Sequence, residues 1–583
     1  MIKLISKAIL SLAVLGTLVL SGCSKDEEAS VPAAAAVEGS ELLRYIPADA
    51  PYAFASLEPL PDDVLDALEP KLDKVLESYQ VVLKEVVAGK LAEDSEDPVS
   101  EEDAERIMAF VNELGSIMSV DGMRSAGIAR DSMIAFYGNG LLPVVRMELT
   151  DPALMDATIA RLEEQAGAEM TVGEVEGQSY RYFDADDIRI IIAIVGNHAV
   201  MSFVPSAFDA AQTAQVLGLE MPARSLADSG VLEGIISDYG FTNHIVGFVD
   251  MPKLAERFID EPTGVDAELM ALLEYDDSAV SDVCKAEVRE FAGIMPRMVA
   301  GYTGIAVNRF DSKLVVELRD DLASALQGLA APVPGLGGDT GALMSFGFSL
   351  DVMAAREFIE ARLDAMEKDP YECEYFADLQ ASVASGRESL NQPVPPMIYD
   401  FRGLHAVIDE IEGLDIATET PPESVDGTFL LAMDNAQNLV NMGAMFSPEL
   451  AALNLQPDGE PVALDLPQVQ AMGMDAFAAL SESALAISVG EGAEGQSKDA
   501  LGADPSEPPP FISFSMDAAR YYSFMGEAVA VGDSDDEHAP TPEMKEAMND
   551  MMTSIADLYD RMSGDVLFTE NGIEVNMTET LKD

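Results

Sequence analysis

The chain has 583 residues, and its 104 acidic and 34 basic side chains give a formal net charge of −70. Its apolar content of 48% is ordinary, so composition excludes a chain that is disordered for lack of hydrophobic residues. A surface this acidic repels nucleic acid and anionic lipid headgroups, so we expect no nucleic-acid partner. An acidic surface is typical of a highly soluble protein or of adaptation to a saline environment. It would also attract cations or a basic partner.

The first 22 residues have the proportions of a signal peptide. Lys3 and Lys7 precede an uncharged, mostly apolar stretch at 8–20, which is shorter than the ~20 residues that a membrane span needs. The segment ends in Leu20, Ser21, Gly22 and Cys23, which resemble the lipobox of bacterial lipoprotein precursors. The resemblance implies cleavage after Gly22, a diacylglycerol on Cys23, and acylation of the new amine, for example by palmitate. An ordinary secretory signal with a chance cysteine is the alternative.

Ser24 follows the expected lipidation site. In Gram-negative lipoproteins an aspartate at this position tends to retain the protein in the inner membrane, so Ser24 favours the outer membrane, with the protein facing the periplasm from its inner leaflet. The next residues are polar and Ala-rich, which is typical of a tether. We therefore expect a signal peptide at 1–22 and a lipidated cysteine with a flexible tether at 23–40.

A strand-to-helix unit recurs along the rest of the chain. Six times an alternating apolar strand runs into an acidic residue and then an amphipathic helix; these acidic residues are Glu58, Asp151, Asp250, Asp351, Asp434 and Asp517. A carboxylate at a helix start accepts hydrogen bonds from unpaired amides and complements the helix dipole. We therefore predict that the six acids are helix caps rather than catalytic groups.

The spacing of these units indicates an internal duplication. The first three junctions precede the last three by 293, 283 and 267 residues. We predict an α+β fold of two tandem, duplicated blocks at 41–328 and 342–583, with largely antiparallel sheets, joined by a Pro- and Gly-rich linker at 329–341. Each block ends in a helix and a hairpin, and Asn571-Gly572 in the second hairpin is typical of a type I′ turn.

Only Cys284 and Cys373 remain after Cys23. In an oxidising compartment such a pair indicates one disulfide, which would close a loop of about 90 residues and stabilise the fold by ~4 kcal/mol in the chain-entropy treatment. Two separate buried thiols are the alternative.

No motif indicates catalysis. The chain lacks a Gly-x-Ser-x-Gly elbow, a phosphate loop, His-Glu-x-x-His and Cys-x-x-Cys. Acidic clusters at 184–187 and 533–537 lack the glycine and distal glutamate of an EF-hand loop, and methionines at 544–562 follow the spacing of a core-facing helix. The histidines are expected to be structural or surface residues: His198, His244, His405 and His538. We expect no catalytic residue, metal site or cofactor.

The segment at 42–58 is similar to the opening of uncharacterised bacterial envelope proteins. In those, a Leu/Ile-Pro-Ala-Asp-x-Pro motif precedes the first strand of a repeated α+β domain, and Ile46, Pro47, Ala48, Asp49 and Pro51 match it. The resemblance implies architecture and location, and no activity.

These observations favour a non-enzymatic lipoprotein of the cell envelope. We expect a scaffold or binding module that is held on a membrane through its N-terminal lipid and has another envelope protein as its candidate partner. A carrier of an apolar ligand or lipid is the alternative, and a hydrolase is a third. The sequence leaves the oligomeric state open.

Overall fold

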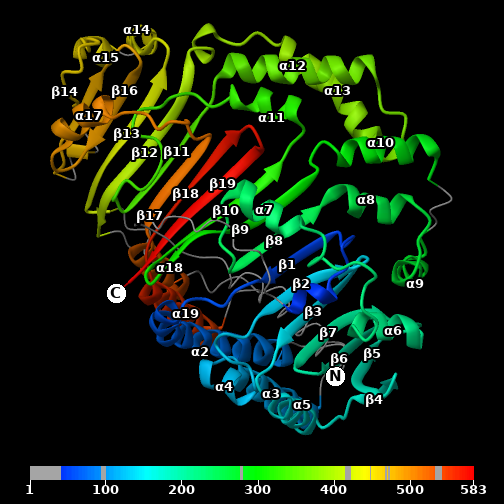
Figure 1. The fold of residues 1–583 in the computed structure, drawn as a ribbon. Helices are drawn as coiled ribbons and strands as arrows, with labels where there is room; N and C mark the ends of the chain where they lie inside the picture. The colour runs from blue at the N-terminus through cyan, green and yellow to red at the C-terminus, as the bar shows by residue number, and fades with distance from the viewer. Residues whose placement is uncertain are drawn as a thin grey trace.

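The computed structural model describes residues 41–92, 100–275, 280–413, 422–446, 448–465, 469–470, 473–531 and 541–582 (Figure 1). Cys23, Ser24 and the tether lie outside these residues, as do His538 and the acidic cluster at 533–537. Within them, no helix is both long enough and apolar enough to cross a membrane.

The first half of the chain contributes ten strands and most of the helices. Its strands are β1 (Tyr52–Ser56), β2 (Ile134–Asn139), β3 (Leu142–Glu148), β4 (Thr171–Val175), β5 (Gln178–Ala185), β6 (Ile188–Val195), β7 (His198–Pro205), β8 (Ile245–Asp250), β9 (Arg297–Ala306) and β10 (Arg309–Glu317). Its helices are η1 (Glu41–Tyr45), α2 (Asp62–Ala92), α3 (Glu101–Ile117), α4 (Val120–Ser125), α5 (Pro152–Ala166), α6 (Ala210–Leu217), α7 (Val231–Tyr239), α8 (Met251–Ile259), α9 (Val265–Leu272), α10 (Asp282–Ala292) and α11 (Asp320–Gln327).

The second half contributes nine strands. They are β11 (Met344–Ser349), β12 (Phe401–Glu412), β13 (Ser424–Met433), β14 (Val462–Ala463), β15 (Ala476–Leu480), β16 (Ala484–Val489), β17 (Ile512–Asp517), β18 (Tyr559–Thr569) and β19 (Gly572–Leu581). The helices are α12 (Val352–Lys368), η3 (Glu374–Phe376), α13 (Ala377–Asn391), η4 (Pro396–Ile398), α14 (Ala436–Phe446), α15 (Pro448–Leu453), α17 (Ala493–Gly502), α18 (Ala518–Val531) and α19 (Pro542–Leu558).

All the strands named above belong to one 19-stranded sheet, and every pairing between them is antiparallel. Helices are interleaved with the strands along the chain and pack around the sheet (Figure 1). The prediction of an α+β fold with a largely antiparallel sheet is confirmed.

The strand order repeats on the two sides of the sheet. Read outward from the centre, the first half runs β10, β9, β8, β1, β2, β3, β7, β6, β5 and β4, and the second runs β19, β18, β17, β11, β12, β13, β16, β15 and β14. If the strands are numbered along the chain within each half, each strand of the second half has the same place in the order as its counterpart in the first half. Only β4 has no counterpart. The order is what a duplication would produce, and the duplication itself stays a prediction.

The two halves lie side by side in one continuous sheet, and helices of each half pack against the other. Strands β10 and β19 pair along their whole lengths, from Arg309 with Thr580 to Glu317 with Gly572. Helix α2 of the first half packs against α19 of the second, where the Ser78 and Ser554 hydroxyls lie 2.7 Å apart. At the other end of the central strands, α12 of the second half lies near α11 (Figure 1), and Arg362 of α12 is 3.4 Å from Asp321 of α11.

The expected linker at 329–341 is part of the core. Val333 and Leu336 are each 1% exposed and pack with Leu430 of β13. Gly347 of β11 permits this close approach, because a Cβ there would lie 2.5 Å from the Leu336 Cδ1 atom. The segment at 329–341 contains no strand, but it packs against the part of the sheet that the second half forms.

Four of the six acidic junctions are confirmed as caps. Asp151, Asp250, Asp351 and Asp517 each accept a hydrogen bond from a backbone amide in the first turn of α5, α8, α12 and α18. Glu58 instead accepts a hydrogen bond from Asn243, and Asp434 pairs with Arg402. The hairpin of β18 and β19 is also present, but the type I′ turn is wrong: Gly572 has φ +132° and begins β19, while Asn571 does not take a positive φ.

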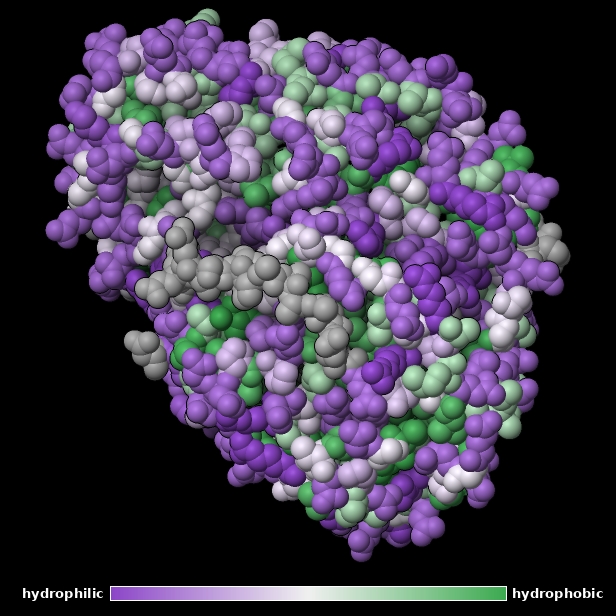
Figure 2. Space-filling model, viewed as in Figure 1, coloured by the Kyte–Doolittle hydropathy of each residue, from purple (hydrophilic) through white to green (hydrophobic). Residues whose placement is uncertain are grey.

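The visible surface is mostly hydrophilic. In the view of Figure 2, hydrophilic residues dominate, with smaller hydrophobic patches between them. The interior holds several apolar clusters, of which the largest joins η1, α6 and α7 to strands of the first half.

Candidate functional site

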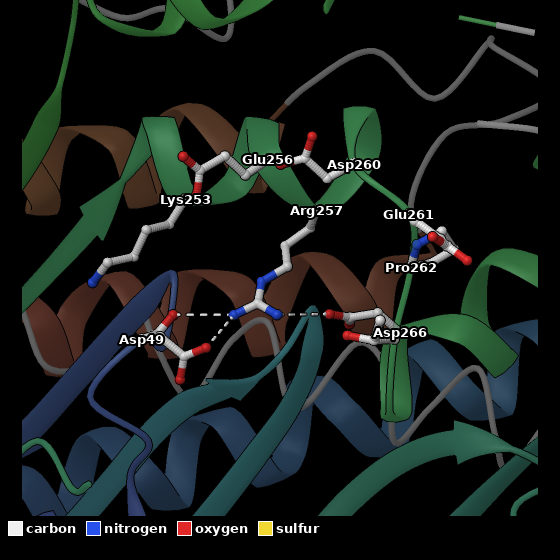
Figure 3. Close-up of a pocket in the computed structure, with 9 residues that line it drawn as sticks. Asp49, Lys253, Glu256, Arg257, Asp260, Glu261, Pro262 and Asp266 are labelled. Carbon is white, nitrogen blue, oxygen red and sulfur yellow. Dashed lines mark hydrogen bonds and ion pairs between the residues drawn. The ribbon is translucent and has the colours of Figure 1, made fainter. Parts of the chain in front are cut away.

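The Pro-Ala-Asp-x-Pro motif lies beside a pocket of about 340 Å³. The pocket is formed by the motif, helix α8, the loop that follows α8 and the start of α9 (Figure 3). Its lining residues are Asp49, Lys253, Glu256, Arg257, Asp260, Glu261, Pro262, Thr263 and Asp266. Segments that are about 200 residues apart in the sequence therefore meet at this site.

Arg257 stands at the centre of the pocket and bridges two carboxylates (Figure 3). Its Nη2 atom donates to Asp49 Oδ2 at 2.8 Å, and its Nη1 atom lies 3.3 Å from Asp266 Oδ2. The side chain of Asp49 is 72% exposed, whereas that of Asp266 is only 3% exposed. One guanidinium thus joins an exposed acid of the motif to a buried acid of α9.

Burial controls the chemistry of Asp266. Its Oδ1 atom accepts a hydrogen bond from the Leu141 amide at 2.7 Å, in the turn between β2 and β3. Burial raises the pKa of Asp266, and the Leu141 amide and Arg257 oppose this rise. Burial and the charge of Asp266 also raise the pKa of Tyr52, whose hydroxyl donates to the Leu141 carbonyl at 3.1 Å.

Lys253 ties helix α8 to the backbone of the motif. Its Nζ atom lies 3.4 Å from the Ala48 carbonyl and 3.5 Å from that of Ala50. Asp250, the cap of α8, lies 3.4 Å from the same Nζ atom. Ile46 is fully buried, so the motif is fixed both by the core and by α8.

The lining combines paired and exposed charged groups. Both basic side chains of the lining are engaged by carboxylates or carbonyls, and the lining contains no histidine, cysteine or serine. Glu256, Asp260 and Glu261 remain exposed at the rim. Such groups can bind a polar partner by hydrogen bonds and charge.

A second polar cluster is buried beneath η1. Arg146 is fully buried, donates to the Leu217 carbonyl at 2.6 Å and lies 3.9 Å from the centre of the Tyr45 ring. His198 Nδ1 is 3.5 Å from Arg146, and burial together with the Arg146 charge lowers the pKa of His198. His198 is 1% exposed, and His405 is 7% exposed and has a pKa lowered by burial; a structural role for both stays a prediction. His244 is partly exposed at the start of β8.

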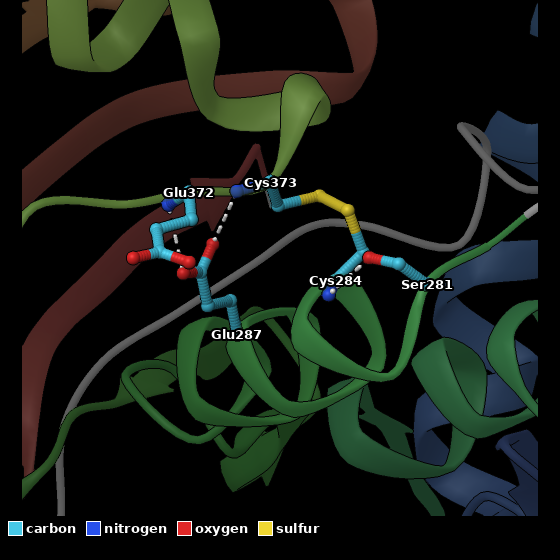
Figure 4. Close-up of a disulfide and its surroundings, with 5 residues drawn as sticks. All are labelled: Ser281, Cys284, Glu287, Glu372 and Cys373. Atoms are coloured by element: carbon cyan, nitrogen blue, oxygen red, sulfur yellow. Dashed lines mark hydrogen bonds between the residues drawn. A yellow bond between two sulfur atoms is a disulfide. The ribbon is translucent and has the colours of Figure 1, made fainter.

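Cys284 and Cys373 form a disulfide, with their Cα atoms 4.7 Å apart (Figure 4). The bond joins α10 of the first half to the segment between α12 and η3 of the second. Glu287 of α10 reinforces the junction, because its carboxylate accepts from the amides of Glu372 and Cys373, each at 2.9 Å. The cysteines are 6% and 3% exposed and belong to a small apolar cluster with Ile259 and Phe376.

Among the described residues, no group of three or more histidine, cysteine or acidic side chains is arranged to hold a metal ion. In the cluster at 184–187, Asp184 is instead paired with Arg189 through two hydrogen bonds of 2.7 and 3.0 Å. Comparison with known protein families, with curated proteins and with solved structures finds no match to this chain.

Sequence analysis identified only the side of the pocket that the motif forms. Asp49 stood out through its motif, but nothing around Arg257 or Asp266 distinguished them from other charged residues. Their role depends on the approach of α8 and α9 to the motif and to the turn at Leu141, and these contacts span 125 residues or more.

Proposed function

We propose that the chain is a non-enzymatic lipoprotein of the cell envelope that acts as a binding module or scaffold. The lipobox at Leu20 to Cys23 supports a lipid anchor, and Ser24 supports sorting to the outer membrane, facing the periplasm. Two or three acyl chains hold a protein stably on a membrane, whereas a single chain is marginal.

The observation that carries the binding role is the bridge from Asp49 through Arg257 to Asp266. It places charged groups around an open pocket in which both basic side chains are already engaged by carboxylates or carbonyls. The hydrolase alternative requires titratable groups that converge in a cleft, and the pocket offers carboxylates that are paired or exposed. Recognition of a polar partner is the function these groups support.

The carrier alternative requires an enclosed apolar space. The pocket at Arg257 is lined mainly by charged side chains. A second pocket of about 370 Å³ is lined by Ala519, Arg520, Ser523, Phe524 and Lys582, and two of these five side chains are basic. Neither lining has the predominantly apolar character typical of sites that bury a ligand of this kind.

Crosslinking in intact cells tests the proposal. The wild-type chain and Arg257→Ala would be crosslinked, purified and analysed for bound protein and lipid, with Arg387→Ala as the control. Arg387 has a similarly exposed side chain and pairs with Asp364 and Glu367 of α12, far from the pocket in the sequence. We expect one reproducible envelope protein, captured by the wild type and the control and reduced in Arg257→Ala. Stoichiometric lipid without a protein partner would contradict the proposal and favour the carrier.

A further inference from the structure

The sheet has two edges, and the strands that form them differ in length. At the end of the second half, β14 has two residues, whereas β4 at the end of the first half has five. Among the described strands, β4 pairs with β5 alone, and it lies at the margin of the molecule (Figure 1). The outer backbone groups of an edge strand have no ladder partner, so they form a template for a further strand.

The turn between β4 and β5 determines which backbone groups face outward. Its two residues take positive φ angles of 53° and 80°, as in a type I′ turn. Val175 and Gln178 flank the turn and form a hydrogen-bonded pair, and such pairs alternate along the two strands. The N–H and C=O groups of Val172 and Glu174 therefore point away from β5. Within the described part of the chain, no residue bonds to these four groups.

The edge is held in place from its inner side. Val175 is 5% exposed and belongs to the largest apolar cluster. The ring of Tyr180 from β5 lies over Gly173, where a Cβ would be 2.4 Å from the Tyr180 Cζ atom. Val172 projects from the other face of the strand and is 67% exposed. An ordered strand loses little conformational entropy when it gains a partner, so β4 is prepared for binding.

Three glutamates determine which strand this edge accepts. Glu169 precedes β4, Glu174 lies within it and Glu176 follows it. All three are exposed, and none forms an ion pair with another described residue. The strand has neither proline nor lysine, which are common guards of an edge. Its glutamates repel a second copy of a chain with a net charge of −70 and attract a basic strand.

The two arginines beside this hairpin are already paired. Arg181 of β5 lies 2.7 Å from Asp156 of α5. Arg106 of α3, which lies against Gly167 shortly before β4, is 2.6 Å from Glu102. Both charges are therefore engaged by acidic residues outside the edge, and they leave the three glutamates unneutralised.

We infer that β4 binds an extended basic segment of a partner protein, which joins the sheet as a further antiparallel strand. Two residues of that segment would complete four backbone hydrogen bonds with Val172 and Glu174. The side chains of Val172 and Glu174 share one face, so an apolar residue fits opposite the first and a basic residue opposite the second. In an antiparallel partner the basic residue stands two positions before the apolar one. This surface is separate from the pocket at Arg257, so the inference goes beyond the proposed function.

Synthetic peptides test the inference on the purified full chain in non-ionic detergent, by fluorescence anisotropy. The probe is a dye-labelled peptide of alternating threonine and lysine, with valine in place of one central lysine. A second peptide carries N-methyl groups on that valine and on the lysine two positions before it, whose amides would face β4. A third carries them on the two neighbouring threonines, whose amides would point away from β4. The three peptides have the same side chains and charge.

Four protein variants with a matched control accompany the peptides. Val172→Pro removes an outward N–H that the β4–β5 ladder does not use, and Val172→Ala shortens the same side chain but keeps the amide. Glu174→Lys reverses a charge at the edge, and Glu388→Lys is the matched control, because Glu388 is exposed on α13 of the second half. Arg257→Ala separates the edge from the pocket.

We expect the probe and the threonine-methylated peptide to bind the wild type with similar affinity. The peptide methylated on valine and lysine should bind at least about tenfold more weakly, because it lacks the donors that reach β4. Val172→Pro should weaken binding of the probe about tenfold, and Glu174→Lys about fivefold or more. Val172→Ala should have a much smaller effect, and Glu388→Lys and Arg257→Ala should match the wild type. Circular dichroism establishes that the variants are folded, and the methylated peptides test the wild type itself.

Equal affinity of the two methylated peptides for the wild type would overturn the inference. Binding that Arg257→Ala loses and Val172→Pro keeps would also overturn it, because the peptide would then occupy the pocket. Sedimentation that shows a wild-type dimer lost in Val172→Pro would replace the partner strand by a second copy. If the probe does not bind the wild type while crosslinked cells still yield a protein partner, the proposed function stands and this inference fails.

Discussion

Asp266 has the least exposed carboxylate in the pocket at Arg257, and its environment shows how tertiary contacts determine the charge of a side chain. The Leu141 amide and the Arg257 guanidinium stabilise its ionised form, while burial disfavours that form and raises its pKa. Asp49, the other partner of Arg257, is largely exposed. The two acids therefore contribute differently to stability, although both contact one arginine.

Replacing Asp266 by asparagine should change how stability depends on pH. Because the pKa is raised in the folded state, the fold binds this proton more tightly than the unfolded chain does. The resulting stabilisation is present below the unfolded pKa of about 4 and is lost as pH rises through the raised value. Relative to the wild type, the free energy of unfolding of Asp266→Asn should therefore increase between about pH 4 and pH 7, as measured by urea denaturation. Asp49→Asn is the matched control, and a difference for Asp266→Asn that does not change with pH would contradict the account.

Sequence analysis identified residues whose contacts lie nearby in the chain, and it missed residues whose contacts are distant in the sequence. Asp49 was recognisable because it belongs to a short motif, and Asp250 because a cap acts within one helical turn. Arg257 and Asp266 contact the motif and Leu141, which are distant from them in the sequence. The sequence around these two residues therefore does not predict the pocket.

At the level of elements, too, features that depend on neighbouring residues were predictable, and features that depend on distant strands were not. The caps at Asp151 and Asp351 were predictable because strand, acid and helix follow one another directly. The type I′ turn at Asn571-Gly572 was wrong because Gly572 is already paired in β19, opposite Glu317 of β10. The partner strand, which lies about 255 residues earlier, decides where that hairpin turns.

Asp351 offers a direct measure of what one cap contributes. Its carboxylate accepts a hydrogen bond from the Ala354 amide at 2.9 Å. Asp351→Ala should lower the free energy of unfolding by about 1 kcal/mol, since the amide loses its acceptor, whereas Asp351→Asn should lower it by much less. Urea denaturation of both variants checks this, and equal losses would show that charge rather than capping matters there.

The disulfide joins helix α10 to the chain after α12, and so it links elements of the two halves. It closes a loop of 89 residues. Cys284→Ser/Cys373→Ser should lower the free energy of unfolding by ~4 kcal/mol, because the unfolded chain gains loop entropy. Chemical denaturation of the variant and of the reduced wild type measures the loss; if reduction changes the stability of the variant as much as that of the wild type, the disulfide is not the cause.

The strand order of the whole molecule could not be predicted from the sequence. Local spacing indicated repeated units and an antiparallel sheet, but not that β10 and β19 would merge them into one sheet. Nor did it show that 329–341, read as a linker for its prolines and glycines, buries Val333 and Leu336. These features arise from pairing between distant segments, which no pattern within either segment encodes.

Because the halves share one sheet and helices of each pack against the other, neither should fold alone. Separated at 341, the first half would expose the edge of β10 and lose the packing of α2 against α19, and the second would lose the corresponding partners. Expressed singly, 41–341 and 342–583 should lack cooperative thermal unfolding by circular dichroism, while the two expressed together should recover it. Cooperative unfolding of either half by itself would show two independent domains.

The central claim is that Cys23 carries the lipid that fixes this protein to a membrane. The most direct measurement is incorporation of radioactive palmitate into the wild type and into Cys23→Ala in growing cells, followed by membrane fractionation. The account predicts a labelled wild type in the membrane fraction and an unlabelled Cys23→Ala, expressed at a similar level, released from it. Continued labelling of Cys23→Ala would contradict it.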